Sequence, residues 1–187
     1  MLFRSVRSNP LVVFGLSSVK PAMMARRIRQ ILQFTWQQMT QTDRAIEIVD
    51  EAWWLLQNPE TAQDLAERAR RFRKKNAALF VATQHVEDFA ANSHAHAVLN
   101  MVATHLLFAQ NSTSLDQIAA IFKLNASEKR SVGLLQPGQY FLKTNKLRLM
   151  LFKPVPPSRY DLYTTVPEEV QRIKARIATE QAQVSKP

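Results

Sequence analysis

Residues Ala45–Leu56 read AIEIVDEAWWLL, and the fold of the chain is organised around this stretch. Apolar β-branched residues at its start favour a buried strand over Ala45–Val49, and the run ends at two adjacent carboxylates, Asp50 and Glu51. Ligands of open parallel sheets bind just beyond the carboxyl ends of the strands. The stretch therefore predicts a strand that delivers two acidic side chains to a binding edge, although two carboxylates that cap the start of a helix fit the same letters.

Acidic side chains at such an edge suit phosphate chemistry. Asp50 would hold Mg²⁺ through its water shell, and Glu51 would orient or deprotonate an attacking water. A second apolar run, Ala77–Thr83, ends at Gln84, which a parallel sheet would place beside the two carboxylates. An amide there would hydrogen-bond the attacking water or a γ-phosphate, whereas the alternative is a polar residue that only ends a strand.

The composition limits the class of protein and favours an anionic partner. A chain of 187 residues with 46% hydrophobic residues is long enough for one domain with a sizeable core. Its net charge of +10 favours nucleic acid, a nucleotide or a membrane surface, while a merely solvated basic surface is the simpler alternative. The absence of cysteine excludes disulfides and thiolate metal sites, and the four histidines form no ligand pattern.

Further apolar runs predict the remaining strands. Leu11–Phe14 and Ala103–Phe108 read as short buried strands. In the last third of the chain the hydrophobic period changes to two, which predicts a β-hairpin of Tyr140–Lys143 and Leu147–Phe152. Helices are predicted at 21–39, 58–74, 86–89, 94–101 and 115–122, with two more starting at 125 and near 165. Strands that alternate with helices predict an α/β sheet with a parallel centre.

The helix predicted after residue 58 has a clear start and an exposed face. An Asn-Pro-Glu sequence at 58–60 combines a capping side chain, a proline and a carboxylate in the first turn. The pairs Asp64–Arg68 and Glu67–Arg71 are spaced i, i+4, so both are predicted as ion pairs on the solvent side of the helix.

Beyond these local patterns, a long part of the chain resembles a known family. The segment VDEAWWLLQNPETAQDLAERARRFRKKNAALFVATQHVEDF resembles the Walker B to sensor segment of the large ATPase of type IV secretion and conjugation systems, in the HerA–FtsK superfamily of hexameric motors. The similarity continues through THLLFAQNSTSLDQIAAIFKLNASEKR and LLQPGQYFL and ends in SRYDLYTTVPEEV. It covers roughly Leu11 to Val170, and the order of the segments is as informative as any single motif.

The resemblance implies a RecA-like motor domain that uses ATP and Mg²⁺. Asp50 matches the family's Mg²⁺-organising aspartate, Glu51 its catalytic glutamate and Gln84 its sensor glutamine. Arg73, eleven residues before Gln84, matches an arginine that would reach the γ-phosphate bound by a neighbouring subunit. A basic helix end that favours the helix dipole explains Arg73 equally well.

Two departures from the family pattern shape the prediction. The family has a P-loop, G-x-x-x-x-G-K-[ST], upstream of these segments. Here only Gly133 and Gly138 have that spacing, and they are followed by Gln139 and Tyr140, so the Walker A segment is missing. Glu47 stands inside the Walker B strand, where the family prefers an apolar residue. We therefore expect a partial ATPase domain over 1–157, from Walker B to the C-terminal hairpin, and an exit segment with a terminal helix over 158–187.

The sequence thus predicts the C-terminal part of an ATP-hydrolysing motor of a conjugative DNA-transfer or type IV secretion system, inactive as an isolated chain. A HerA-type DNA-translocating helicase and a non-catalytic module that binds DNA or partner subunits are the alternatives. The implied partners are copies of the same chain in a hexamer, other secretion-system subunits, and DNA through the basic surface. The implied location is the cytoplasm, including the inner face of the bacterial cell membrane.

The missing segment also predicts the order of the strands. In the family the P-loop strand lies beside the strand that ends at the sensor glutamine. The expected order is therefore Leu11–Phe14, Ala45–Val49, Ala77–Thr83, a gap, and Ala103–Phe108. Unpaired backbone groups inside a sheet cost about 1–3 kcal/mol each. Either Ala103–Phe108 closes directly against Ala77–Thr83, or two strand edges remain unpaired.

Overall fold

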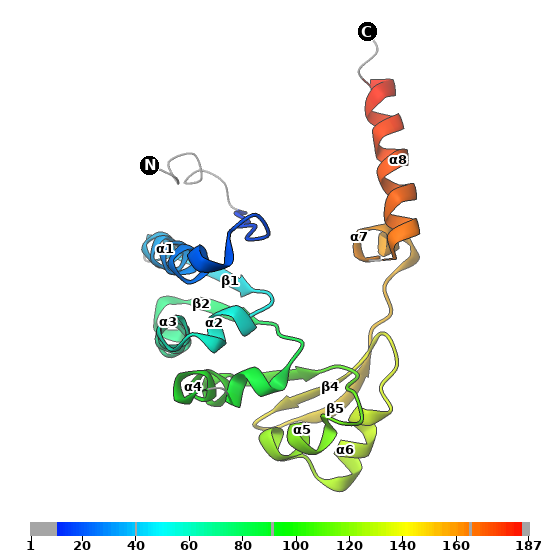
Figure 1. The fold of residues 1–187 in the computed structure, drawn as a ribbon. Helices are drawn as coiled ribbons and strands as arrows, with labels where there is room; N and C mark the ends of the chain where they lie inside the picture. Colours follow the sequence, from blue (N-terminus) through cyan, green and yellow to red (C-terminus); the bar gives the residue numbers. More distant parts are fainter. Residues whose placement is uncertain (1–10, 40, 91, 165, 185–187) are drawn as a thin grey trace. The chain divides into compact units, whose positions relative to one another are not determined.

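The computed structural model describes residues 11–39, 41–90, 92–164 and 166–184. Its contacts divide the chain into two compact units, of which unit 1 ends at Ala103 and unit 2 begins at Thr104 (Figure 1). Along the described part of the chain, no helix combines the length and the apolar content that crossing a membrane requires. The division into a partial domain over 1–157 and an exit segment over 158–187 stays a prediction.

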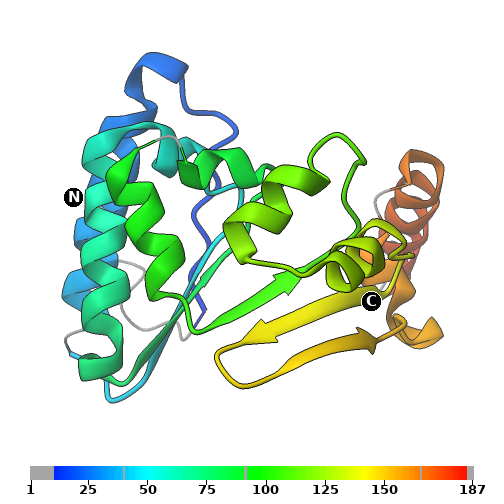
Figure 2. The ribbon, with the colours of Figure 1, turned by 90° about the horizontal axis from the view of Figure 1, so that it is seen from below.

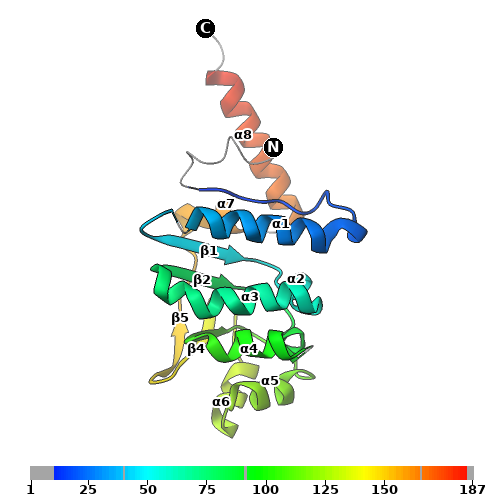
Figure 3. The same ribbon diagram turned by 90° about the vertical axis from the view of Figure 1, so that its left-hand side faces the viewer.

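Unit 1 is a two-stranded parallel sheet with helices on one side. Strands β1 (Ala45–Val49) and β2 (Ala77–Val81) pair in parallel, with Ala45 opposite Ala77 and Val49 opposite Val81. The helices are α1 (Pro21–Met39), α2 (Trp53–Gln57), α3 (Pro59–Arg71) and α4 (Ser93–Met101), with 3₁₀ turns η2 (Phe72–Lys75) and η3 (Val86–Ala90). Helices α1, α3 and α4 lie side by side along the same side of the two strands (Figures 1 and 3).

The core of unit 1 lies between these helices and one face of the sheet. Its buried apolar side chains include Ile28 and Leu32 of α1, Leu65 of α3, and Val98 of α4. The other face of the sheet is uncovered: Ile46, Ile48 and Phe80 are 70%, 72% and 57% exposed. Because parallel sheets are normally covered on both faces, unit 1 has the architecture of a partial α/β domain.

Unit 2 begins with a three-stranded antiparallel sheet in the order β3-β4-β5. The strands are β3 (Thr104–Leu107), β4 (Gln139–Thr144) and β5 (Arg148–Phe152), and helices α5 (Leu115–Phe122) and α6 (Ala126–Gly133) lie on one side of them (Figure 2). A capping box starts α6: the Asn125 side chain accepts from the Glu128 N–H, and the Glu128 carboxylate accepts from the Asn125 N–H. Arg148 of β5 donates to Glu128 Oε2 at 2.6 Å and so ties the sheet to α6.

The chain then continues into two further helices of unit 2. They are α7 (Tyr160–Tyr163), which follows a 3₁₀ turn η4 (Pro157–Arg159), and α8 (Pro167–Val184). Arg176 of α8 donates to Asp161 Oδ2 of α7 at 2.6 Å, and Thr164 bonds the Glu169 carboxylate. These contacts hold the start of α8 against α7.

Several predicted elements are confirmed. Helix α1 spans the predicted 21–39, the side chain of Asn58 caps α3, and β4 and β5 form the predicted hairpin. The mixed α/β class, with a short parallel sheet, flanking helices, a C-terminal hairpin and a terminal helix, is that of a partial RecA-like domain.

The strand predicted over Leu11–Phe14 is wrong. These residues have no regular secondary structure, and Leu11 and Val13 are 73% and 82% exposed. Instead, the ring of Phe14 packs edge-on against Phe34 of α1, with 6.1 Å between ring centroids. Phe14 therefore packs on a helix, and no strand pairing of this run is seen among the described residues.

The predicted order of the strands is also wrong in part. Strands β1 and β2 are neighbours as expected, but β3 pairs antiparallel with β4, in a different sheet from β2. The direct closure of Ala103–Phe108 against Ala77–Thr83 is therefore not found. Among the residues described, β2 and β3 each pair with a strand along one edge only, which is the second of the two expected outcomes. A hairpin that follows in the sequence gives β3 an alternative hydrogen-bonding partner.

Candidate functional site

Two loops at the carboxyl ends of β1 and β2 form the candidate site. The ladder continues past both strands, because Ala82 N donates to Val49 O and Ala52 N donates to Ala82 O, each at 2.9 Å. The loop with Asp50 and Glu51 is thereby tied to the loop that leads to Gln84. This is where ligands of parallel sheets bind.

Within this site, Gln84 contacts Glu51 directly. Gln84 Nε2 donates to Glu51 Oε1 at 2.5 Å, although the two residues are 33 apart in the sequence. Glu51 has φ of 50°, in the left-handed region that a residue with a Cβ rarely adopts. Such backbone strain persists only where the surroundings enforce it, and it concentrates at functional sites. The structure therefore brings together two of the residues predicted from the sequence.

Asp50 completes the acidic part of the site. Its side chain is exposed, and its Oδ1 accepts the Glu51 N–H at 3.0 Å, which helps hold the left-handed turn. Among the described residues, no group of three or more metal-ligating side chains gathers anywhere. One exposed carboxylate fits a Mg²⁺ ion that keeps most of its waters and is otherwise held by substrate phosphates.

The two glycines with P-loop spacing have a different role. Gly133 ends α6, and Gly138 has φ of 83° at the turn into β4, where its carbonyl accepts from Lys153 N at 2.8 Å. Both glycines therefore serve turns of unit 2.

Arg73 lies at the other end of the strands. It belongs to η2, which precedes β2, whereas Asp50 and Glu51 follow β1. Since the strands pair in parallel and β1 has five residues, Arg73 and the acidic loop are separated by the length of the sheet, about 16 Å. The structure does not bring Arg73 into the site of its own chain.

The most buried charge among the described residues of unit 1, that of Arg68, was not predicted from the sequence. Arg68 was expected to pair with Asp64 on the solvent side of α3, but its side chain is 6% exposed and its Nη1 lies 2.8 Å from Glu47 Oε2. Asp64 instead pairs with Arg29 of α1 at 3.5 Å, while the predicted Glu67–Arg71 pair is confirmed at 3.8 Å. No local pattern reveals the Arg68–Glu47 pair, because the two residues are 21 apart.

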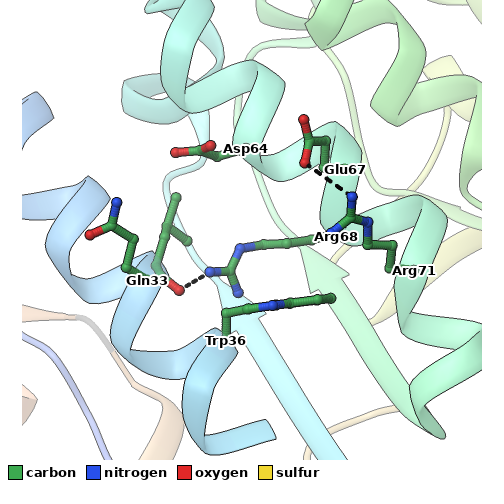
Figure 4. A pocket seen from close by; sticks show the side chains of 7 residues that line it. Gln33, Trp36, Asp64, Glu67, Arg68 and Arg71 are labelled. Carbon is green, nitrogen blue, oxygen red and sulfur yellow. Dashed lines mark hydrogen bonds and ion pairs between the residues drawn. The ribbon is translucent and has the colours of Figure 1, made fainter. Parts of the chain in front are cut away.

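The surroundings of Arg68 connect α1, α3 and β1. In Figure 4 its guanidinium crosses the pocket between α1 and α3 and points to a backbone carbonyl of α1, which is that of Leu32. It also lies 5.8 Å from the ring centroid of Trp36. Thr35 of α1 donates to Glu47 Oε1 at 2.7 Å. Glu47, the polar residue inside the predicted Walker B strand, is thus the centre of a buried polar network.

The fold and the site together define a class: part of a RecA-like domain with the carboxylate loop and the glutamine loop side by side. No protein-family model matches the sequence, and no curated protein sequence matches it significantly. Among solved structures, VirB4 of Thermoanaerobacter pseudethanolicus is similar, with a TM-score of 0.66 and 24% identity over 78% of this chain and 41% of the VirB4 chain.

A viral protein shares the same fold. The genome packaging NTPase B204 of Sulfolobus turreted icosahedral virus 2, in complex with ATP-gammaS, matches with a TM-score of 0.56 and 15% identity over 78% of this chain and 74% of B204. Its complex with AMPPCP matches with a TM-score of 0.52, again at 15% identity, over 70% of this chain and 62% of B204. This chain therefore spans less than half the length of VirB4 and shares the fold of both proteins.

Proposed function

We propose that this chain forms the C-terminal part of an ATP-hydrolysing motor of a conjugative DNA-transfer or type IV secretion system. The observation that carries the proposal is the 2.5 Å contact between Gln84 and Glu51, beside Asp50, at the carboxyl ends of two paired parallel strands. The fold shared with VirB4 and with a packaging NTPase solved in complex with nucleotides supports it.

Each residue of the site has a distinct role in this proposal. Asp50 would hold Mg²⁺ through its water shell, and the ion would supply positive charge for the phosphates of the nucleotide. Glu51 accepts the proton of the attacking water or orients it, and Gln84 fixes the direction of the Glu51 carboxylate and bonds the γ-phosphate when nucleotide is present. Arg73 acts on the nucleotide of a neighbouring subunit, since it cannot reach its own site.

The proposed motor needs parts beyond these residues. A P-loop supplied by another segment would anchor the phosphates, and copies assembled in a ring would let Arg73 of one copy reach the next, with a hexamer as the expected form. Other secretion-system subunits are the expected partners, in the cytoplasm or at the inner face of the membrane. A HerA-type helicase would use the same four residues, and the ending SRYDLYTTVPEEV favours secretion.

Nucleotide assays on two forms of the protein test the proposal. The isolated chain should not hydrolyse ATP measurably, while the chain joined to a P-loop-bearing upstream segment should. In the joined form, Glu51→Gln should lower the turnover by about 10²–10⁴ and leave ATP binding nearly intact. Glu87→Gln, on the neighbouring turn η3, is the matched control and should stay near the parent.

Two outcomes would contradict the proposal. If the isolated chain turns over ATP robustly and Glu51→Gln removes that turnover, no P-loop is required. If Glu51→Gln in the joined form stays within a few-fold of the parent, Glu51 is not the catalytic carboxylate.

A further inference from the structure

The two ends of the unit 1 strands carry opposite charge. Four acidic residues follow the strands, and five cations together with the acid Asp43 precede them. The acidic residues are Asp50, Glu51, Glu87 and Asp88, and the cations, named here the cationic edge, are Arg44, Arg70, Arg73, Lys74 and Lys75. All five members of the cationic edge are exposed. The proposed function uses Arg73 alone, so the other four cations have no role in it.

The fold gathers the cationic edge from two separate segments. Arg44 directly precedes β1 and the other four cations precede β2, and the strands start opposite one another at Ala45 and Ala77. Asn76 joins the segments: its Nδ2 donates to Asp43 O at 2.9 Å. Asn76 also has φ of 52°, and its N–H closes the η2 turn on Phe72 O. The cations are therefore held together by specific bonds of the backbone and of Asn76.

Asp43, next to Arg44, is an acid that borders the cationic edge, so five cations there face one neighbouring carboxylate. None of its five members forms an ion pair among the described residues. The dipole of α3 favours cations, but only within its last turn, so it does not account for Arg44 or for the cations of η2. A concentrated positive field of this kind attracts polyanions.

We propose that the cationic edge binds the phosphate backbone of nucleic acid without reading its sequence. A bilayer fits less well, because the one large apolar residue of the η2 turn, Phe72, is 3% exposed and stacks on Trp36, so it cannot insert. Reading of adenine, which needs an amide side chain, is not expected either, since the Asn76 amide beside these cations already donates to Asp43 O. The interactions are then charge pairs with phosphates, which are strongly salt-dependent.

A comparison of two variants with equal charge tests this proposal on the full chain. The edge variant replaces Arg44, Arg70, Lys74 and Lys75 by Gln. The control variant replaces Arg130, Lys146, Lys153 and Lys174 by Gln, which are also exposed and outside any ion pair of the described residues but are dispersed over unit 2. Replacing four cations by Gln lowers the net charge of each variant from +10 to +6. Arg73 is kept in both variants.

Binding is measured by fluorescence anisotropy with short duplex DNA of two unrelated sequences, without nucleotide, between about 50 and 200 mM salt. We expect the parent and the control variant to bind both duplexes alike. The edge variant should bind far more weakly, and its salt dependence should be shallower by about 0.9 for each phosphate that it no longer neutralises, or roughly 3 to 4 in the log–log slope. Thermal unfolding should be the same for all three proteins, since only exposed side chains change.

Each other result overturns the proposal. Equal losses of affinity in both variants would show that net charge alone drives binding, and an unchanged affinity of the edge variant would place the binding surface elsewhere. Binding to vesicles of anionic lipid but not to DNA would identify a membrane surface instead. The assay contains no nucleotide, so its result on DNA binding does not depend on whether the chain takes part in ATP hydrolysis.

Discussion

Replacing Arg68 by methionine should strongly destabilise unit 1. Arg68 is buried and Glu47 is largely so, with side chains 6% and 10% exposed, and their closest N–O distance is 2.8 Å. Removing the guanidinium leaves the Glu47 carboxylate buried with the Thr35 hydroxyl as its remaining partner. Breaking a buried ion pair in this way costs about 3–5 kcal/mol, because the remaining charge is then without both water and its partner.

The double variant Glu47→Leu, Arg68→Met should recover most of that stability. It removes both charges together, and replacement of a whole buried pair by apolar residues is neutral or stabilising by about 1–4 kcal/mol in other proteins. The double variant should therefore unfold near the parent or above it. The Leu that replaces Glu47 is also the kind of apolar residue that the resembled family prefers at this position.

Tryptophan fluorescence in urea measures both variants. All three tryptophans, Trp36, Trp53 and Trp54, belong to unit 1, so their emission reports on this unit without a contribution from unit 2. The midpoint and slope of the transition give the free energy of unfolding. Exposed Arg130→Met is the control, and it should stay within about 0.5 kcal/mol of the parent. A destabilisation below about 1 kcal/mol for Arg68→Met, or a double variant as unstable as the single one, would refute the reasoning.

Two further predictions concern the ends of the sheet and the acid stability of unit 2. In the joined, P-loop-bearing form, Arg73→Ala should abolish ATP hydrolysis without weakening ATP binding, and the control Arg70→Ala should have little effect. A mixture of the Arg73→Ala and Glu51→Gln proteins should recover some hydrolysis, because Arg73 of one copy can then act at the intact Glu51 site of the other. If the mixture recovers none, a simple helix-end role for Arg73 is favoured. Burial raises the pKa of Glu128, but the Asn125 N–H and the Arg148 guanidinium outweigh that effect and lower its pKa below the ordinary 4.5. A carboxyl whose pKa is lower in the folded state stabilises above its unfolded pKa and loses that contribution as the pH falls through the folded value. The melting temperature of Glu128→Gln should thus lie below that of the parent at neutral pH and approach it as the pH falls below 4.5 and through the lowered pKa of Glu128. A difference that does not change with pH would contradict this.

Much of the local structure follows from the sequence alone. The Asn-Pro-Glu start of α3, the Asn125 capping box and the strand of Ala45–Val49 are each specified within one or two turns of chain. The placement of Gln84 beside Glu51 also followed from the sequence, because both residues end apolar runs and the ends of neighbouring parallel strands meet at one edge.

Tertiary structure decided which partner each segment took. Arg68 had an acid one turn away, yet it bonds Glu47, because a buried cation must be neutralised by whichever carboxylate lies inside the core. The run Leu11–Phe14 is apolar enough for a strand, but Leu11 and Val13 are exposed and Phe14 packs on Phe34 of α1. Strand β3 pairs with β4 of the hairpin that follows it and not with β2. An apolar run favours burial, whereas the neighbour that buries it, and whether one is present, depends on which edges and faces the rest of the chain leaves open.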